Sequence, residues 1–99
     1  MEYMDNTRFQ WDQSKNLANF KKHKISFDEA KTVFFDESAR VIPDPEHSVN
    51  EERFIILGIS NKLKLLVVVH TYRKDDGVIR IISARKASKS EIKYYNEVK

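Results

Sequence analysis

The residues best suited to chemistry lie in a strand-like segment near the C-terminus. Residues 78–87 read Val-Ile-Arg-Ile-Ile-Ser-Ala-Arg-Lys-Ala, so charges interrupt an apolar run that favours a strand. An unpaired charge in a buried strand is costly, so we expect Arg80 and Arg85 to have either a bound ligand or a charged partner. Arginine carries a permanent charge on a planar fork that fits phosphate, which predicts phosphate handling. Pairing with some of the fifteen carboxylates is the structural alternative, and for any single arginine neither reading is favoured.

Strand alternation assigns these cations to faces. It puts Arg80 and Arg85 on opposite faces of their strand. Arg73 lies at the end of the preceding strand, residues 63–72. Register decides which side chains share a surface, and the sequence does not fix it. We expect this hairpin to bring several candidates near one end of the sheet: Arg73, Arg80, Arg85, His70 and Tyr72.

The three histidines occupy different settings. His23 ends the first expected helix, where a cation meets the helix dipole, and this structural reading is favoured. His70 lies in an apolar strand, which predicts a hydrogen-bonded core or rim residue. His47 lies in a polar loop, where functional residues are often found, so it is the histidine most worth testing. The three are too widely spaced for a recognised metal motif, and no metal or cofactor is expected.

Metal-free cleavage of RNA is the chemistry that fits these residues. Gly58 and Gly77 stand apart, so the chain has no glycine-rich phosphate loop. RNA supplies its own nucleophile, the 2′-hydroxyl; a protein needs to align it, move protons and stabilise charge on the phosphorane. Arginines, a histidine, a lysine and a tyrosine suffice. Trp11 or Tyr72 could stack a base, although Trp11 fits a core position better.

Length and composition limit the class of protein. Ninety-nine residues make a single domain, 1–99, and the absence of cysteine excludes disulfides and thiolate metal sites. The longest apolar run, residues 65–69, is far too short for a membrane helix, and the N-terminus lacks a secretory signal, so we expect a cytoplasmic protein with no membrane partner. A net charge of +3 is compatible with a nucleic-acid partner and does not prove one.

Helix signals flank a block of strands. Residues 8–11 alternate polar and aromatic side chains and predict a short strand; Asp12 then caps a helix over 13–22. Ser26 with Glu29, and Ser88 with Glu91, are capping boxes that begin two more helices. The last of these is expected to pack on the sheet through three side chains: Ile92, Tyr95 and Val98.

The strands lie between the second and third helices. Residues 39–42, 53–59, 63–72 and 78–87 predict four strands, with a tight hairpin at residues 60–62. Strands segregated from helices indicate an α+β fold, with an antiparallel sheet of about four to five strands covered by helices on one side.

Several segments together resemble the BrnT family, ribonuclease toxins of type II toxin–antitoxin systems. The matching segments are Phe9-Gln10-Trp11-Asp12 with Lys15 and Asn19, Lys22-His23, Ile25-Ser26-Phe27-Asp28-Glu29-Ala30, Glu52-Arg53-Phe54, Leu57-Gly58, Thr71-Tyr72-Arg73, residues 79–87, Glu91 and Tyr95. They run in order over residues 9–95. Lys24 departs from the family, which commonly has Gly after that histidine; a left-handed residue there would be mildly strained. The turn between Arg73 and Arg80 also looks longer than usual.

The resemblance implies a RelE-like fold, RNA cleavage that halts translation, and neutralisation by a cognate antitoxin. That antitoxin would be a ribbon-helix-helix protein similar to BrnA, through which the complex would bind promoter DNA. The family's polar positions fall here on Lys15, His23, His47, Arg53, Arg73, Arg80, Arg85, Glu91 and Tyr95.

We therefore predict roles for eight residues. The catalytic residues are Arg73 and Arg85, for phosphate and transition-state charge, and His47 or Lys15, for proton transfer. The RNA-binding residues are Arg53, Arg80, Tyr72 and Lys86, of which Arg53 and Arg80 could instead be structural partners of Glu29, Glu51 or Glu52. Two alternatives remain: a nucleic-acid or ribosome-binding module without catalysis, and a degenerate toxin that only binds its antitoxin as a co-repressor partner.

Overall fold

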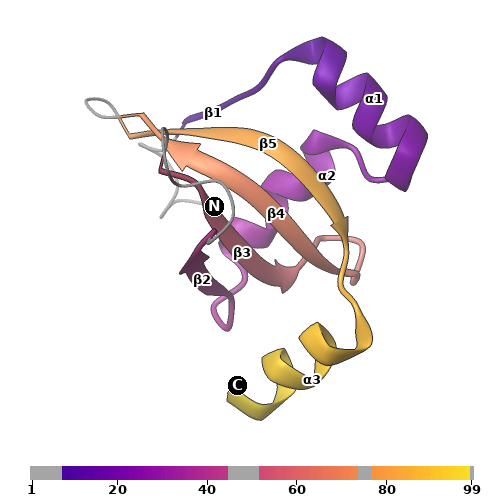
Figure 1. Cartoon of the computed structure of the whole chain (residues 1–99), viewed down its shortest axis with the longest axis vertical. Helices are drawn as coiled ribbons and strands as arrows, with labels where there is room; N and C mark the ends of the chain where they lie inside the picture. Colours follow the sequence, from indigo (N-terminus) through magenta and orange to yellow (C-terminus); the bar gives the residue numbers. More distant parts are fainter. Residues whose placement is uncertain (1–7, 45–51, 74–76, 99) are drawn as a thin grey trace.

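The computed structural model describes residues 8–44, 52–73 and 77–98 (Figure 1). Along the chain, the elements are β1 (Arg8–Gln10), α1 (Gln13–His23), α2 (Phe27–Ala30), the 3₁₀ helix η2 (Lys31–Phe35), β2 (Arg40–Pro43), β3 (Phe54–Ile59), β4 (Leu65–Tyr72), β5 (Val78–Lys86) and α3 (Lys89–Val98). The strands form one sheet in the order β1-β5-β4-β3-β2. The α+β fold predicted from the sequence is confirmed. Among the described residues, no helix is long and apolar enough to cross a membrane.

The sheet is mixed, which corrects the expectation of a purely antiparallel one. β2 to β5 pair antiparallel in chain order, as the hairpins predict. β1 instead pairs parallel with β5, placing Arg8 opposite Val78 and Gln10 opposite Arg80. Hairpin signals report only on strands that follow one another in the chain. They give no information on β1, which is separated from its partner by most of the protein.

The helices begin where the sequence predicts because their caps are local. Asp12 Oδ1 accepts from the backbone N–H groups of Ser14 (2.8 Å) and Lys15 (3.4 Å) at the start of α1. Ser26 Oγ accepts from Glu29 N at 3.0 Å and begins α2. These bonds satisfy backbone donors that a helix start otherwise leaves without partners. The second helix tightens into η2 after one turn instead of remaining α-helical.

One face of the sheet packs against α1, α2 and η2 and holds the main core. Its fully buried side chains include Ile25, Phe27, Val33, Leu66 and Val68. Gly58 is needed where β3 meets η2, because a Cβ there would lie 3.1 Å from Val33 O. Burial of these side chains is the largest favourable contribution to folding.

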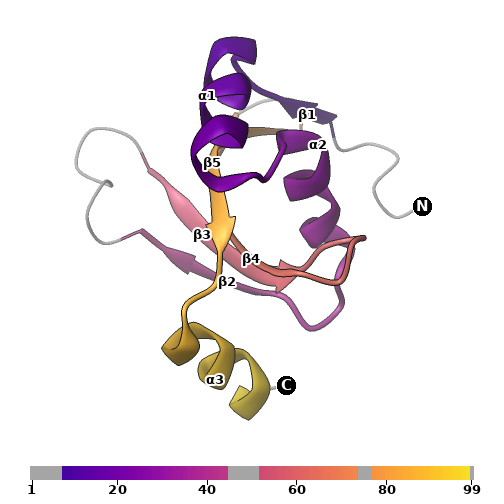
Figure 2. The ribbon, with the colours of Figure 1, turned by 90° about the vertical axis from the view of Figure 1, so that its right-hand side faces the viewer.

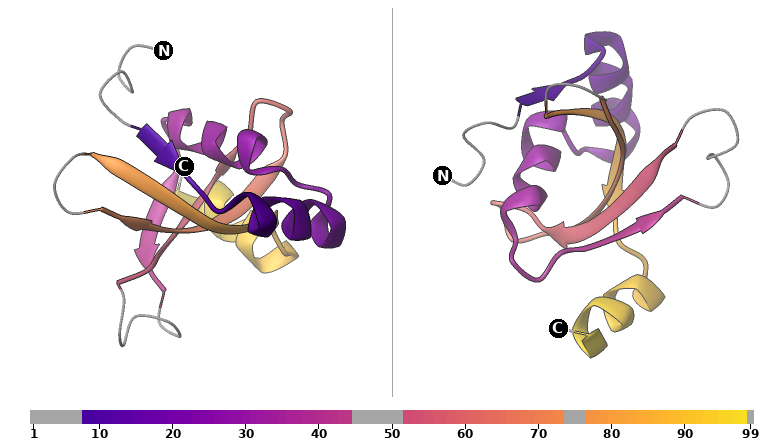
Figure 3. Two further views of the ribbon diagram at one scale, coloured as in Figure 1. Left: turned by 90° about the horizontal axis from the view of Figure 1, so that it is seen from above. Right: turned by 90° about the vertical axis from the view of Figure 1, so that its left-hand side faces the viewer.

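The other face is covered at one end by α3, so helices pack on both sides and the one-sided arrangement is wrong. Tyr95 is buried against Leu57 and Val67, which point away from the main core. Ile92 was expected in this contact but is 41% exposed, and the Val98 side chain lies outside the description. Figures 2 and 3 show α3 separated from α1 and α2 by the curved sheet. β3 and β4 are apolar on both faces, which allows this second layer.

A β-bulge in β5 changes which arginines share a face. Val69 pairs with Ser83, but His70 pairs with Ile81, so Ile82 is an extra residue. The strict alternation used for the sequence therefore fails: Arg80 pairs with Thr71 and Arg85 with Val67, on the same face. Arg80 and Arg85 were expected on opposite faces, but the extra residue shifts the alternation by one and puts both on the same face.

Candidate active site

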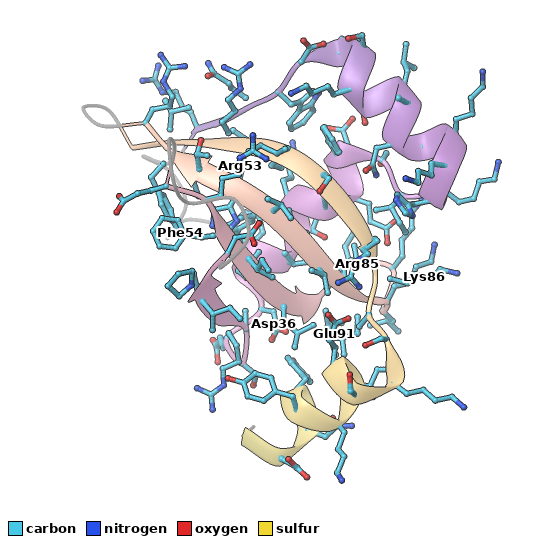
Figure 4. The ribbon with its side chains drawn as sticks, viewed as in Figure 1. Asp36, Arg53, Phe54, Arg85, Lys86 and Glu91 are labelled. Atoms are coloured by element: carbon cyan, nitrogen blue, oxygen red, sulfur yellow. The ribbon has the colours of Figure 1, made fainter. Side chains whose placement is uncertain are left out.

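A hollow of about 340 Å³ opens on the face of the sheet that carries Arg85. Its floor is apolar and comes from the middle strands, through Ile55, Val67, Val69 and Ile82. Its polar lining consists of His23, Asp44, Arg53, Ser83 and Arg85. Figure 4 shows Arg53 and Arg85 well separated along the curved sheet. The hollow thus joins two guanidinium groups, an imidazole and a carboxylate over an apolar base.

Arg53 and Asp44 enter the hollow from the ends of neighbouring strands. Phe54 pairs with His70 on the face covered by α1, α2 and η2, so Arg53, one residue earlier, belongs to the opposite face. Asp44 follows β2, and its backbone N–H donates to Arg53 O at 2.8 Å, which extends the β2–β3 ladder by one step. Asp44 is only 6% exposed. Pairing of the two strands therefore fixes both residues at this edge of the hollow.

Asn19 holds His23 over β5. Its side-chain amide donates to Ala84 O and to Ile25 O, both at 2.9 Å, and its Oδ1 accepts from Ala84 N at 3.1 Å. Asn19 is buried, and these bonds join α1 to the strand one residue before Arg85. His23, one turn farther along α1, lies at the rim of the hollow as a result.

Arg85 is held by a bidentate ion pair. Its Nη1 and Nη2 donate to Oε1 and Oε2 of Glu91, each at 2.9 Å. Figure 4 shows the two side chains meeting between the end of β5 and α3. The Arg85 hydrogen bonds lower the pKa of Glu91 to about 2, and the Glu91 bond raises the pKa of Arg85. The structural alternative predicted for the arginines is thus present at Arg85, which also lines the hollow.

A second contact fixes α3 beside this ion pair. Tyr95 OH donates to Asp36 Oδ2 at 2.6 Å, and the same oxygen accepts from Ile59 N at 2.8 Å. Burial and the Asp36 hydrogen bond raise the pKa of Tyr95 to about 12. Two side chains one helical turn apart therefore anchor α3: Glu91 bonds Arg85 of β5, and Tyr95 bonds Asp36, which itself accepts from β3.

Arg73 and Arg80 lie near one end of the sheet with His70 and Tyr72, as expected for several of these residues. Arg85 is the exception and lies at the far end. Arg85 pairs with Val67, and Arg73 follows six residues later along β4, roughly 20 Å away at the rise of a strand. Arg73 Nη1 donates to Gln10 Oε1 at 2.9 Å. Arg80 shares the face of Arg85, is half-buried and does not line the hollow.

Tyr72 and Lys86 belong to the face of the sheet that α1, α2 and η2 cover, opposite the hollow. Tyr72 packs against Phe54, with ring centroids 5.2 Å apart, and its OH lies 3.1 Å from His70 Nε2. Lys86 pairs with Leu66 at the end of β5. His70 is fully buried, as its strand position predicted.

The remaining predicted residues do not reach the hollow or lie outside the description. Lys15 is exposed on α1, two turns before His23 and about 12 Å from it along the axis. His47 is outside the described residues. Glu29, considered as a partner for Arg53 or Arg80, accepts instead from Ser60 Oγ at 2.7 Å and lies 3.9 Å from Lys64 Nζ.

The sequence did not assign His23, Asp44 and Ser83 to a common site. His23 was read as structural because its place at a helix end explains a cation without any partner. Ser83 shares the face of Arg85 by simple alternation, but its pairing with Val69 of β4 is what brings it into the hollow. Each of these placements depends on contacts between segments far apart in the chain, which leave no local pattern.

Comparison with known proteins identifies the family. The model of the ribonuclease toxin BrnT of type II toxin–antitoxin systems matches residues 11–91. This chain belongs to the BrnT family. The crystal structure of the Brucella abortus ribonuclease toxin BrnT is similar to it, with a TM-score of 0.64 and 25% identity, over 84% of this chain and 99% of that one. The search of curated proteins found no match.

The match confirms the resemblance and covers the hollow. All five polar lining residues and Glu91 fall within residues 11–91. Membership of a type II system implies an antitoxin partner for this BrnT protein. Lys24, where the family commonly has Gly, is left-handed, with φ 62°, and its backbone N–H donates to Phe20 O at 2.8 Å. The strain predicted at this position is therefore present.

Proposed function

We propose that this BrnT toxin is a metal-independent endoribonuclease that binds RNA across the hollow between α1, β3 and β5. The observation that carries the proposal is that Arg53, Arg85 and His23 line the same hollow with an apolar floor. Two guanidinium groups can pair with the oxygens of a phosphodiester, and an imidazole can serve as a proton acceptor or donor. This supports cleavage in which protein cations stabilise the developing charge.

The reaction needs one bond made and one broken at phosphorus. The 2′-oxygen of the RNA attacks the adjacent phosphorus after losing its proton to a base, for which His23 is placed at the rim. The P–O5′ bond then breaks, the 5′-oxygen takes up a proton, and a 2′,3′-cyclic phosphate remains. We assign stabilisation of the phosphorane oxygens to Arg85 with Arg53, because both line the hollow. For the second proton transfer, His47 stays the predicted candidate, and Lys15, the other one predicted, does not line the hollow.

We propose that the cleavage inhibits translation and that a cognate antitoxin neutralises it. Membership of a type II toxin–antitoxin family supports the existence of that protein partner. The resemblance supports a ribbon-helix-helix antitoxin, through which the complex would bind promoter DNA and repress its own synthesis. The net charge of +3 favours RNA as substrate through its phosphates.

Growth arrest by single-residue variants tests the assignment of the site. Arg85→Ala is expected to abolish arrest at equal soluble expression, whereas Arg73→Ala, at the far end of the sheet, is expected to retain it. The comparison separates the hollow from the sequence-based assignment of Arg73. Arrest by Arg85→Ala that equals wild type would contradict the proposal; arrest lost only with Arg73→Ala would move the site to the other end.

Cleavage products distinguish the enzyme from a binding module. RNA treated with the wild type should carry 2′,3′-cyclic phosphate ends, and 2′-O-methyl RNA should bind without being cut. A protein that arrests growth and binds RNA but leaves both substrates intact would be a non-catalytic module. A protein that binds its antitoxin alone would be a degenerate toxin.

A further inference from the structure

The Arg85–Glu91 pair uses one edge of the guanidinium and leaves another available. Arginine has five N–H donors in a fixed plane. Nη1 donates to Glu91 Oε1 at 2.9 Å and to Lys86 O at 3.2 Å, and Nη2 donates to Glu91 Oε2 at 2.9 Å. These bonds use three of the five donors. The two that remain are Nε–H and the second Nη2–H, which point in the same direction.

This remaining edge has the geometry that a phosphate requires. Two parallel N–H groups from one guanidinium edge bind two oxygens of a phosphate or carboxylate at once. Among the described residues, no acceptor occupies the Nε–Nη2 edge. Arg85 lines the hollow and its side chain is 45% exposed, so an incoming phosphodiester can reach it. A free arginine side chain would instead have to be ordered when the substrate binds.

Glu91 is itself fixed, so it can fix its partner. Its Oε1 accepts from Ser88 N at 2.7 Å, and its backbone N–H donates to Ser88 Oγ at 3.3 Å, the reciprocal pair of a capping box. With its pKa lowered to about 2, the carboxylate keeps its charge throughout the physiological range. The sheet contact of Tyr95 with Asp36 holds the helix that carries it.

We propose that Glu91 is a positioning residue for RNA cleavage: it holds the Arg85 guanidinium so that its Nε–Nη2 edge faces the scissile phosphate. The inference rests on the proposed function and extends it to a residue that does not touch the substrate. It assigns the first turn of α3 to the active site, in addition to its role in covering the sheet.

Glu91→Gln is the decisive variant because it separates the ion pair from the helix cap. Glutamine at this position still completes a capping box, so α3 keeps its start. It cannot accept two charge-assisted bonds from Arg85, so the guanidinium plane is released. We expect the rate of cleavage, as kcat/KM on a defined RNA, to fall roughly 10–100-fold, in line with the effect of small misplacements of catalytic groups.

Two matched variants control for effects on α3 alone. Ser88→Ala removes the cap hydroxyl and leaves both oxygens of Glu91 on Arg85. Glu97→Gln removes a carboxylate from the same helix, where it forms an exposed pair with Lys93 at 3.9 Å. Both are expected to cleave within a few-fold of wild type. Loss of activity in Ser88→Ala equal to that in Glu91→Gln would overturn the proposal, since it would trace the effect to the helix cap.

Coupling to Arg85 identifies the residue through which Glu91 acts. If Glu91 works by holding the Arg85 guanidinium, then adding Glu91→Gln to Arg85→Lys, which keeps a charge but has no planar guanidinium, changes the remaining rate little. Two independent losses that multiply would overturn the positioning role. A wild-type protein that cleaves RNA while Glu91→Gln cleaves it equally well would also overturn it, without affecting the proposed function.

The Nε–Hε resonance of Arg85 reports contact between the guanidinium and RNA without requiring cleavage. In nuclear magnetic resonance spectra, addition of a 2′-O-methyl RNA oligonucleotide is expected to shift this resonance in wild type and to shift it less in Glu91→Gln. RNA that shifts backbone resonances of Val69 and Ser83 but not Arg85 Nε–Hε would overturn the positioning role. An RNA that shifts none of them would overturn the proposed function and the inference together.

Discussion

Acidification is expected to weaken the fold through His70, which is buried in its neutral form. Burial lowers the pKa of this side chain from 6.5 to about 4. Its Nδ1 lies 3.2 Å from Val68 O, and because a carbonyl only accepts, Nδ1 carries the proton and Nε2 accepts from Tyr72 OH at 3.1 Å. The Phe34 ring packs on it with centroids 4.9 Å apart. A second proton would place a charge among these groups.

The magnitude follows from the shift in pKa. An unfolded chain binds a proton at His70 below pH 6.5, whereas the folded chain does so only below about pH 4. The stability that depends on neutral His70 is therefore complete above pH 6.5 and is lost as the pH falls toward 4. At about 1.4 kcal/mol for each pH unit of difference, the loss is on the order of 3 kcal/mol. That is a large part of the stability of a small domain.

Urea unfolding at a series of pH values measures this loss. The free energy of unfolding should fall between pH 6.5 and 4 in the wild type, and less steeply in His70→Phe. Tyr72→Phe is the matched control: it removes the hydroxyl partner, but burial still lowers the pKa of His70, so the pH dependence should persist. A wild-type curve that is flat over this range, or one that His70→Phe leaves unchanged, would refute the reasoning.

Three further predictions concern contacts that position the site. Asn19→Ala removes the bonds joining α1 to β5 and should lower the free energy of unfolding by about 3 kcal/mol in chemical denaturation, with a concurrent loss of cleavage. Lys24→Gly should raise the free energy of unfolding by up to about 1 kcal/mol, because glycine tolerates φ 62° without strain. Thermal unfolding measures this gain. Tyr95→Phe should lower the free energy of unfolding by about 2 kcal/mol through loss of the bond to the Asp36 carboxylate, measured in the same way. An unchanged midpoint in Asn19→Ala or Tyr95→Phe would contradict the contribution of the removed hydrogen bonds, and one in Lys24→Gly would contradict the strain at Lys24.

The elements predicted well are those whose signals are local. Asp12, Ser26 and Ser88 each accept a hydrogen bond from a backbone N–H within three residues, so the start of each α-helix in the described part of the chain could be predicted from the sequence. The strands from β2 to β5 follow from short runs of apolar and β-branched residues separated by turns. The left-handed conformation at Lys24 was expected from the family resemblance, in which Gly commonly stands there, and not from a local signal.

The elements predicted poorly depend on contacts between distant segments. The parallel pairing of β1 and the side on which α3 packs have no signal within their own residues. The bulge at Ile82 is one residue in length, and it reverses the facing of every later side chain in β5. Arg80 and Arg85 were therefore assigned to the wrong relative faces.

The candidate site was predicted in part. Arg85 and Arg53 were chosen from the sequence for their chemistry, and both line the hollow. His23 was set aside because its helix position gave it a sufficient structural reason. Its place over β5 comes from Asn19, which bonds a residue sixty-five positions later. That contact could not be derived from either segment alone.

The most direct test of the account is cleavage of a defined RNA by purified protein, freed of antitoxin and refolded, in excess EDTA. Wild type, Arg85→Ala and Arg73→Ala are compared at equal concentration. The account predicts that wild type and Arg73→Ala cut the RNA and leave 2′,3′-cyclic phosphate ends, while Arg85→Ala leaves it intact. RNA that stays whole with the folded wild type, or that Arg85→Ala cuts equally well, would contradict a metal-free active site in this hollow.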